Sequence, residues 1–224
     1  DMYCWGTNGS YQLGYKTSTA DRYATKVNAT GTFTAVTAGK NFTCGILNGT
    51  AVCWGVNTAG QAGAATSASR IPSSLPITVG NSSVFSSTLQ ATAISAGDSH
   101  ACAVLQGASY CWGADTYGQI GNNTTTASVA SLYAVNGGDM APDPTNVKNL
   151  NMTPASIGIA AGGSTSCNVA NGLINCWGNN ADLEAGKDTT NQGQTAPDPT
   201  SKVLAPLTAQ WYRYEAALNK GTFY

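Results

Sequence analysis

One motif, Cys-Trp-Gly, occurs four times in the 224 residues and constrains the fold more than any other feature. The copies begin at Cys4, Cys53, Cys111 and Cys176. Each copy is followed by a glycine-rich block of turn-forming residues, most clearly over residues 55–63 and 113–121. Recurrence of this kind is typical of repeat architectures, in which each repeat buries its apolar face against its neighbours.

The motifs stand about 50 to 65 residues apart, a spacing that suits four-stranded propeller blades. The uneven spacing indicates loop insertions, the longest over residues 67–90 and 124–151, which are rich in Ser, Thr, Asn, Pro and Gly. The sequence therefore predicts an all-β chain, a β-propeller of diverged four-stranded blades with three complete repeats plus half-blades at each end. The repeats are expected at approximately 5–54, 54–112, 112–177 and, in part, 177–224, within a single propeller or propeller fragment over 1–224.

A two-residue turn between strands fixes how the cysteines pair. Asn48-Gly49 is the strongest signal of this kind, because a type I′ hairpin turn needs positive φ at both central residues. Counting outward from it places Cys44 opposite Cys53 at a non-hydrogen-bonded position, where Cα atoms approach within about 4.5 Å. The same count around residues 106–107 and 171–172 completes the prediction of three disulfides: Cys44–Cys53, Cys102–Cys111 and Cys167–Cys176.

One repeat carries a resemblance to a known family. Residues 96–102 read Ala-Gly-Asp-Ser-His-Ala-Cys, residues 112–113 read Trp-Gly, and residues 118–121 read Gly-Gln-Ile-Gly. This pattern resembles the regulator of chromosome condensation repeat, and the likeness covers most of the chain apart from the insertions and the last stretch. The resemblance implies a seven-bladed propeller, in a family whose members act in nucleotide exchange on a small GTPase, in protein inhibition or in scaffolding. The paired cysteines and the few charges depart from the nuclear members and look closer to Cys-Trp-Gly variants of secreted and surface proteins.

The tryptophan of each motif is next to a cysteine, so it points to the opposite face of its strand. We expect Trp5, Trp54, Trp112 and Trp177 to pack between blades as the repeat core. An aromatic sugar-binding surface is the alternative, and packing is favoured because one tryptophan recurs in each repeat.

The two ends of the chain do not close a hairpin. Cys4 is the odd one of seven cysteines and is expected to be unpaired or intermolecular, since its partner by register would precede Asp1. Residues 202–217 resemble the strands that precede the next motif, and the chain is expected to be a mature or partial product. Three explanations stay open: a piece of a larger propeller, a small ring closed by both half-blades, or a polymer formed by strand addition. The first is the simplest.

Composition limits the partners and the compartment. Charged residues make up 9% and the net charge is −1, which argues against nucleic acid and acidic membranes as partners. No apolar run is long enough for a membrane span. Disulfides persist in oxidising compartments, so an extracellular or cell-surface location is expected.

The glycosylation candidates are the Asn-x-Ser/Thr positions Asn8, Asn28, Asn48, Asn81, Asn122 and Asn151.

No constellation for chemistry emerges, and we expect neither an enzyme nor a bound cofactor or metal. His100 is the only histidine, and it falls at the family's repeat position, where a structural hydrogen bond is the usual role. Zinc needs four converging ligands, and each hairpin offers two thiols. Asp143 and Asp198, in two Ala-Pro-Asp-Pro-Thr segments, lack the further acidic ligands that calcium prefers.

The sequence thus predicts an extracellular structural or interaction protein, a disulfide-pinned propeller that displays loops and covalently attached glycans. A subunit of a surface filament or coat is the form we favour, with other protein subunits as partners, including itself through the chain ends. The alternative is a secreted binding module, an inhibitor or a lectin-like protein, that uses the insertions at 67–90 and 124–151.

Overall fold

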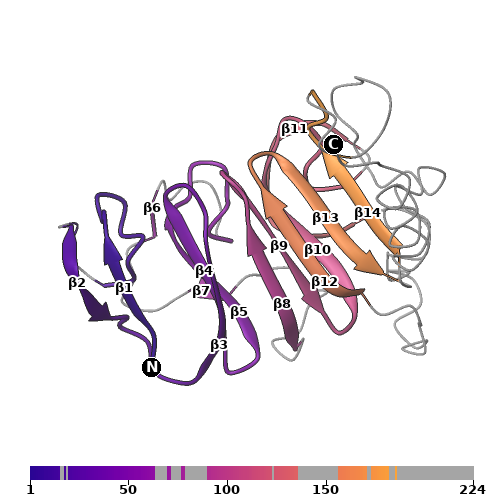
Figure 1. Ribbon diagram of the computed structural model, residues 1–224. Helices are drawn as coiled ribbons and strands as arrows, with labels where there is room; N and C mark the ends of the chain where they lie inside the picture. The colour runs from indigo at the N-terminus through magenta and orange to yellow at the C-terminus, as the bar shows by residue number, and fades with distance from the viewer. Residues whose placement is uncertain are drawn as a thin grey trace, which may run out of the picture.

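The computed structural model describes residues 1–15, 18, 20–63, 70–71, 77–78, 90–122, 124–135, 156–170, 173–181 and 185. Every regular element in these residues is a β-strand, and all strand pairs are antiparallel (Figure 1). Over the same residues there is consequently no helix that has the length and hydropathy to cross a bilayer. The all-β prediction is confirmed.

The strands form four sheets in chain order, which we number as blades 1 to 4. Blade 1 holds β1 (Tyr3–Gly6) and β2 (Asp21–Lys26). Blade 2 holds β3 (Phe33–Ala38), β4 (Phe42–Leu47), β5 (Thr50–Val56), β6 (Arg70–Ile71) and β7 (Ile77–Thr78), the last two both pairing with β5. Blade 3 holds β8 (Ala91–Ala96), β9 (His100–Leu105), β10 (Ala108–Asp115) and β11 (Thr126–Ala134). Blade 4 holds β12 (Ser156–Gly162), β13 (Thr165–Ala170) and β14 (Leu173–Gly178).

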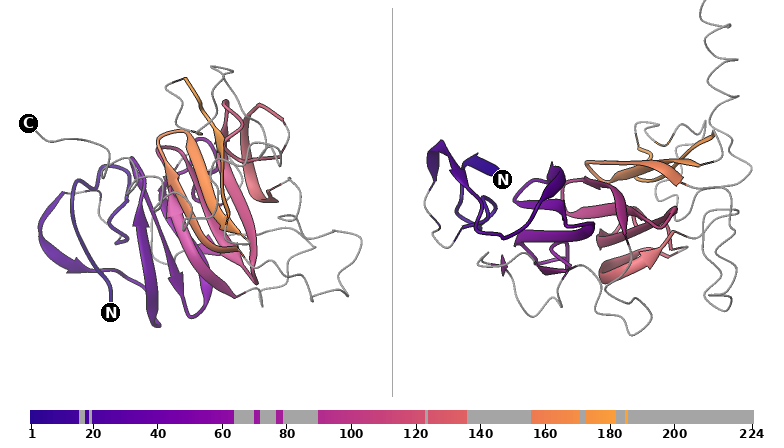
Figure 2. Two further views of the ribbon diagram at one scale, coloured as in Figure 1. Left: turned by 45° about the vertical axis from the view of Figure 1, so that its right-hand side comes forward. Right: turned by 90° about the horizontal axis from the view of Figure 1, so that it is seen from below.

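The blades stand face to face in a row that starts at blade 1 and ends at blade 4 (Figures 1 and 2). Blade 1 has two described strands, β1 and β2. Blade 3 shows the full four-stranded order β8-β9-β10-β11. The half-blade predicted after residue 177 lies mostly outside the described residues, and the repeat boundaries and the number of blades in a complete ring stay predictions.

The hairpins have the register that the sequence predicts. Asn48 and Gly49 have φ of 50° and 79°, and Gln106 and Gly107 have φ of 50° and 81°, as type I′ turns need. Cysteines stand opposite one another in all three hairpins, and each pair is bonded with a Cα–Cα distance of 4.1 Å. The predicted disulfides Cys44–Cys53, Cys102–Cys111 and Cys167–Cys176 are therefore confirmed. The turn residues 171–172 lie outside the described residues.

The core lies between the blades, because neighbouring sheets in the row cover one another's faces. Trp54, Trp112 and Trp177 are the largest fully buried side chains, each at 0% exposure. Trp54 and Trp112 belong to one apolar cluster, while Trp177 packs in a second cluster beside the Cys102–Cys111 disulfide. The core is thus a series of interblade layers, each built around one tryptophan.

Replacing both Cys102 and Cys111 by Ala is expected to lower the free energy of unfolding by about 2 to 3 kcal/mol. The bridge closes a loop with a sequence separation of 9 residues, and constraint of the unfolded chain by so short a loop is limited to about this size. Urea unfolding of the variant beside the oxidised parent measures the difference. Cys4→Ala, which breaks no disulfide, is the control, and a loss as large in that variant would contradict the assignment.

Candidate functional site

The turn block after each Cys-Trp-Gly motif closes on itself around one Asn or Asp side chain. In every copy its Oδ1 accepts a hydrogen bond from the backbone N–H five residues later. The four pairs are Asn8 with Leu13 at 2.9 Å, Asn57 with Ala62 at 3.0 Å, Asp115 with Ile120 at 3.1 Å and Asn180 with Ala185 at 3.0 Å. A short polar side chain that accepts from the backbone is the usual chemistry of turns.

The glutamine in this block also bonds to its own turn. The side chains of Gln12, Gln61 and Gln119 each accept a backbone N–H from two residues earlier, at 2.9 Å. Their side-chain oxygens are therefore engaged inside the block. Their backbone carbonyls point outward and receive the tryptophan of the following blade.

Each buried tryptophan donates its indole Nε1–H to one of these carbonyls. Trp54 donates to Gln12, Trp112 to Gln61 and Trp177 to Gln119, at 3.0, 3.0 and 2.9 Å. A buried indole N–H needs such a partner, because leaving it unsatisfied costs about 1 to 3 kcal/mol. The tryptophan of one blade and the turn block of the preceding blade thus form a repeated docking unit.

Glycine is required where the indole crosses the block. Gly121 has a φ of 74°, and a Cβ there would lie 2.8 Å from Trp177 Nε1. Gly14 has a φ of 84°, and a Cβ there would lie 3.0 Å from Trp54 Nε1. We use the name tryptophan socket for this glycine together with the glutamine carbonyl two residues before it.

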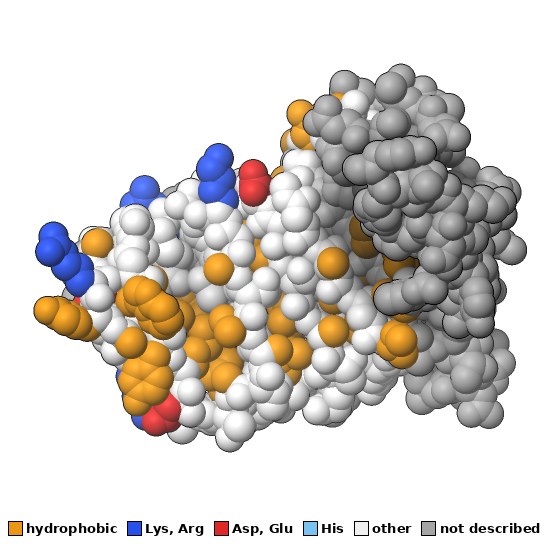
Figure 3. All heavy atoms as spheres, in the orientation of Figure 1, with side chains coloured by type: hydrophobic (Ala, Val, Ile, Leu, Met, Phe, Trp, Pro, Cys, Tyr) orange, Lys and Arg blue, Asp and Glu red, His pale blue; other side chains and the backbone are white. Residues whose placement is uncertain are grey.

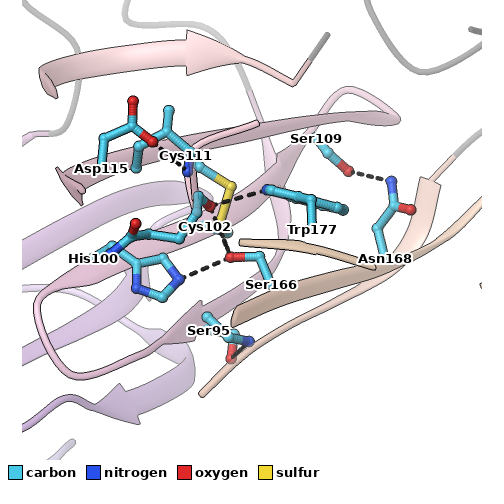
Figure 4. The surroundings of a disulfide bond; sticks show 12 residues. Ser95, His100, Cys102, Ser109, Cys111, Asp115, Ser166, Asn168 and Trp177 are labelled. Carbon is cyan, nitrogen blue, oxygen red and sulfur yellow. Dashed lines mark hydrogen bonds between the residues drawn. A yellow bond between two sulfur atoms is a disulfide. The ribbon is translucent and has the colours of Figure 1, made fainter. Parts of the chain in front are cut away.

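The two faces of a blade consequently have different roles. The tryptophan face meets the preceding blade, and the disulfide face meets the following one. Figure 4 shows the Cys102–Cys111 bridge of blade 3 beside Trp177 and Ser166 of blade 4, with Ser166 Oγ 3.5 Å from Cys102 Sγ. The alternation of Cys and Trp along one strand produces this division.

His100 is buried between blades 3 and 4 and has a structural hydrogen bond there. Its Nε2 lies 2.8 Å from Ser166 Oγ, and that hydroxyl donates to the Gln119 carbonyl at 2.9 Å (Figure 4). His100 Nε2–H therefore donates the hydrogen bond to Ser166 Oγ, and Nδ1 is the unprotonated nitrogen of the ring. Within the described part of the chain, Nδ1 is the single buried side-chain nitrogen or oxygen that lacks a partner. Burial lowers the pKa of His100 to about 4.

Two hydroxyl residues that the sequence analysis did not single out also join the blades. Thr37 Oγ1 in blade 2 accepts the N–H of Ala96 in blade 3 at 3.0 Å. Ser95 Oγ in blade 3 accepts the N–H of Ala161 in blade 4 at 2.9 Å. Each lies one residue before the Ala-Gly pair of its repeat. This recurrent position is the sequence signal that could have identified them.

The prediction that all four tryptophans pack between blades is wrong for Trp5. Trp5 is 64% exposed, whereas the other three are fully buried. The reason is that burial comes from the turn block of the preceding blade, and no such block faces Trp5 among the described residues. Tyr3, two residues earlier on the same face, is 51% exposed as well.

Cys4 carries a free thiol within the structure, as predicted for the odd cysteine. It is half-buried against the interblade core on the disulfide face of blade 1. Burial raises the pKa of the Cys4 thiol above its ordinary value. A bond from Cys4 to another subunit stays a prediction.

The structure separates the glycosylation candidates by exposure. Asn28 and Asn48 are exposed. Asn8 is fully buried and Asn122 is 8% exposed. Both side chains accept hydrogen bonds inside their turns, Asn8 from Leu13 and Asn122 from Thr124. Asn81 and Asn151 lie outside the described residues, and attachment of glycans stays a prediction.

The described residues hold no group of three or more His, Cys, Asp or Glu side chains placed to bind a metal ion. The buried titratable side chains His100 and Asp115 each belong to the scaffold. Burial raises the pKa of Asp115, and hydrogen bonds from Ile120 and Thr126 act in the opposite direction. Asp143, Asp198 and most of the two long insertions lie outside the described residues.

Successive antiparallel sheets joined by a repeated tryptophan socket define a repeat protein of the β-propeller class. Family models of the regulator of chromosome condensation (RCC1) repeat match residues 91–119 and 106–169. Residues 91–169 of the chain thus match the RCC1 repeat. A search of curated protein sequences finds no match to the chain.

Solved structures support the same fold. Yeast RCC1 (Prp20) bound to Kap60 matches with 19% identity and a TM-score of 0.67, over 88% of this chain and 43% of that one. Human WBSCR16 matches with 16% identity and a TM-score of 0.66, over 87% and 51%. Saccharomyces cerevisiae Prp20p matches with 19% identity and a TM-score of 0.66, over 88% and 45%. The chain therefore spans about half the length of the propellers it matches.

Replacing Trp112 by Ala is expected to lower the free energy of unfolding by about 3 to 5 kcal/mol, the usual loss for a large buried aromatic side chain. The variant also removes the only indole donor to the Gln61 carbonyl that the structure shows. Chemical denaturation measures the change. Tyr117→Ala removes a side chain that is 40% exposed and should alter stability by less than about 0.5 kcal/mol. Equal losses in both variants would contradict the role of the socket.

Stability is expected to fall as the pH falls from about 6.5 to about 4. The unfolded chain binds a proton at His100 throughout this window, while the folded protein keeps the imidazole neutral until its pKa of about 4. The loss attributable to this group is roughly 3 kcal/mol. His100→Phe should flatten that part of the pH profile, because the phenyl ring does not titrate. The ring should fit the site, since Phe42 faces Gly39 in blade 2 as His100 faces Gly97. An unchanged slope in the variant would show that other groups cause the dependence.

Proposed function

We propose that this chain is an extracellular structural and interaction protein with no enzymatic role. Its disulfide-pinned blades hold variable loops and glycans in fixed positions for contact with other proteins. The observation that carries the proposal is the bond between opposed cysteines at the same place in three successive blades. Such bonds persist in oxidising compartments and are rare in reduced ones.

The surface supports this assignment. Charged residues make up only 9% of the sequence, and on the face shown in Figure 3 the Lys, Arg, Asp and Glu side chains are few. So low a charge content argues against nucleic acid as a partner, because its binding requires a basic patch. Solubility without charge depends on hydroxyl and amide groups, which glycans would supplement.

A role in binding proteins agrees with the partners of the matched propellers. Yeast RCC1 is described as bound to Kap60, and Prp20p by its binding to Gsp1p and histones. We infer that this chain also contacts proteins, but outside the nucleus. Subunits of a surface filament or coat are the partners we propose.

The test is a map of disulfides in native material whose thiols are blocked at the moment of lysis. The expected result is that the peptides joined by Cys44–Cys53, Cys102–Cys111 and Cys167–Cys176 are recovered as bonded pairs. Cys4, which is free within one copy, should either carry the blocking reagent or be recovered in a bond to another subunit. Recovery of all seven cysteines in the blocked form would place the protein in a reducing compartment and overturn the proposal.

A further inference from the structure

The layer between blades 3 and 4 carries a polar pair where the layer between blades 2 and 3 carries an apolar one. Across the former, His100 Nε2 lies 2.8 Å from Ser166 Oγ (Figure 4). His100 lies opposite the glycine of its Cys-Trp-Gly motif, and Phe42 has the same place in blade 2. Ser166 lies opposite the tryptophan of its motif, and Ala101 has the same place in blade 3. Phe42 and Ala101 both belong to the larger apolar cluster.

A second pair differs between the two layers in the same way. Asn168 Nδ2 of blade 4 donates a hydrogen bond to Ser109 Oγ of blade 3 at 3.0 Å (Figure 4). One blade earlier, Ala103 and Ala51 have these two places, and both are buried in the larger apolar cluster. The docking of blade 4 therefore depends on hydrogen bonds where the docking of blade 3 depends on apolar contact, in which no proton takes part.

The polar pair is connected to the tryptophan socket that holds blade 4. The Ser166 hydroxyl donates to the Gln119 carbonyl at 2.9 Å, and the same carbonyl accepts the indole N–H of Trp177 at 2.9 Å. His100 is thus separated from the socket by one hydroxyl group. A change in the protonation of the imidazole acts directly on the contacts that dock the tryptophan.

The imidazole has no place for a second proton while the two blades are docked. Because Ser166 Oγ donates to Gln119, His100 Nε2 uses its own proton toward Ser166. Nδ1 has no partner, and it lies so close to Gly97 that a Cβ there would be 2.6 Å from it. A proton on Nδ1 would create a buried charge and a buried donor without an acceptor, both of which are costly. Separation of blade 4 from blade 3 admits water to the ring and removes this cost.

No other described group near His100 accounts for loosening by acid. Strands β8, β9, β12 and β13 contain no Lys, Arg, Asp or Glu. Asp98, in the turn before β9, is exposed. Tyr110 lies on the tryptophan face of β10, and Tyr117 is 40% exposed in the turn block. Burial raises the pKa of Asp115 in β10, so the folded protein binds a proton there more readily and acid stabilises this site.

We propose that the layer between blades 3 and 4 is an acid-sensitive joint, in which a proton taken up by His100 releases Trp177 and blade 4 from blade 3 while blades 2 and 3 stay docked. This goes beyond the proposed function, because it concerns the conditions under which the scaffold is rigid. The joint belongs to the oxidised, folded protein in any compartment.

The expected size of the effect follows from the two states of the imidazole. Burial lowers the pKa of His100 to about 4 in the closed layer, whereas an imidazole in water has a pKa of about 6.5. Each unit of pH below about 6.5 therefore favours the open layer about tenfold, until about pH 4, and the whole window gives ~300-fold.

The experiment follows hydrogen exchange of the indole N–H groups by NMR between pH 7 and pH 4, on purified protein with its disulfides intact. Trp177 reports on the layer between blades 3 and 4, and Trp112 on the layer between blades 2 and 3, since each donates to a glutamine carbonyl of the preceding blade. Their ratio cancels the intrinsic effect of pH on exchange. Trp177 is expected to accelerate relative to Trp112 by at least ~30-fold of the ~300-fold available. A constant ratio, including one in which both indoles accelerate together because the whole chain unfolds, overturns the proposal.

Matched variants assign the effect to the imidazole. His100→Phe, alone or together with Ser166→Ala, recreates the pair Phe42 and Ala101 of the preceding layer and should hold the exchange ratio constant over the pH range. Protection of the Trp112 indole verifies that each variant is folded. Asp115→Asn is the control, because Asn57 and Asn180 have this place in blades 2 and 4, and it should keep the parent's pH dependence. A pH dependence that persists in His100→Phe, or disappears in Asp115→Asn, also overturns the proposal. Either failure would leave the disulfide map of the native material unaffected.

Discussion

The hydrogen bond from a tryptophan indole to a glutamine carbonyl of the preceding blade holds the row of blades in register. It recurs three times at 2.9 to 3.0 Å, and each time the indole is also the largest side chain of its interblade layer. The residues around the indole are those that this contact requires. The Asx side chain closes the turn block, the glutamine side chain bonds inward so that its carbonyl faces out, and glycine leaves room for the ring. A single contact thus sets both the spacing and the chemistry of the repeat.

The disulfides complement this contact because they stiffen blades 2, 3 and 4 on the face that the tryptophan leaves free. Cysteine and tryptophan are adjacent along the strand, so one stabilises the hairpin and the other docks it on its neighbour. His100 and Ser166 show how the same layer tolerates variation. The imidazole fills a place where blade 2 has Phe42, and burial keeps it neutral above its pKa of about 4. The few titratable groups of the described core serve packing, which agrees with the proposed role as a scaffold for contact.

Docking between blades also decides which side chains at the ends of the described row are exposed. Every inner blade has its tryptophan covered and its turn block filled, whereas blade 1 exposes Trp5 and blade 4 carries a turn block that no described tryptophan occupies. Repeat proteins have this difficulty in general, because each unit buries its faces only against its neighbours.

The sequence by itself determined the local structure. Asn48-Gly49 fixed a type I′ turn and with it the opposition of Cys44 and Cys53, since strand register follows from counting residues away from a known turn. Only the tertiary structure decided what each repeat touches. Nothing in the residues around Trp5 distinguishes it from Trp112, and its exposure depends on whether a turn block far away in the chain lies against it. Likewise, the contact of His100 with Ser166 and the bonds of Thr37 and Ser95 arise across blades, where sequence periodicity carries no information on distance.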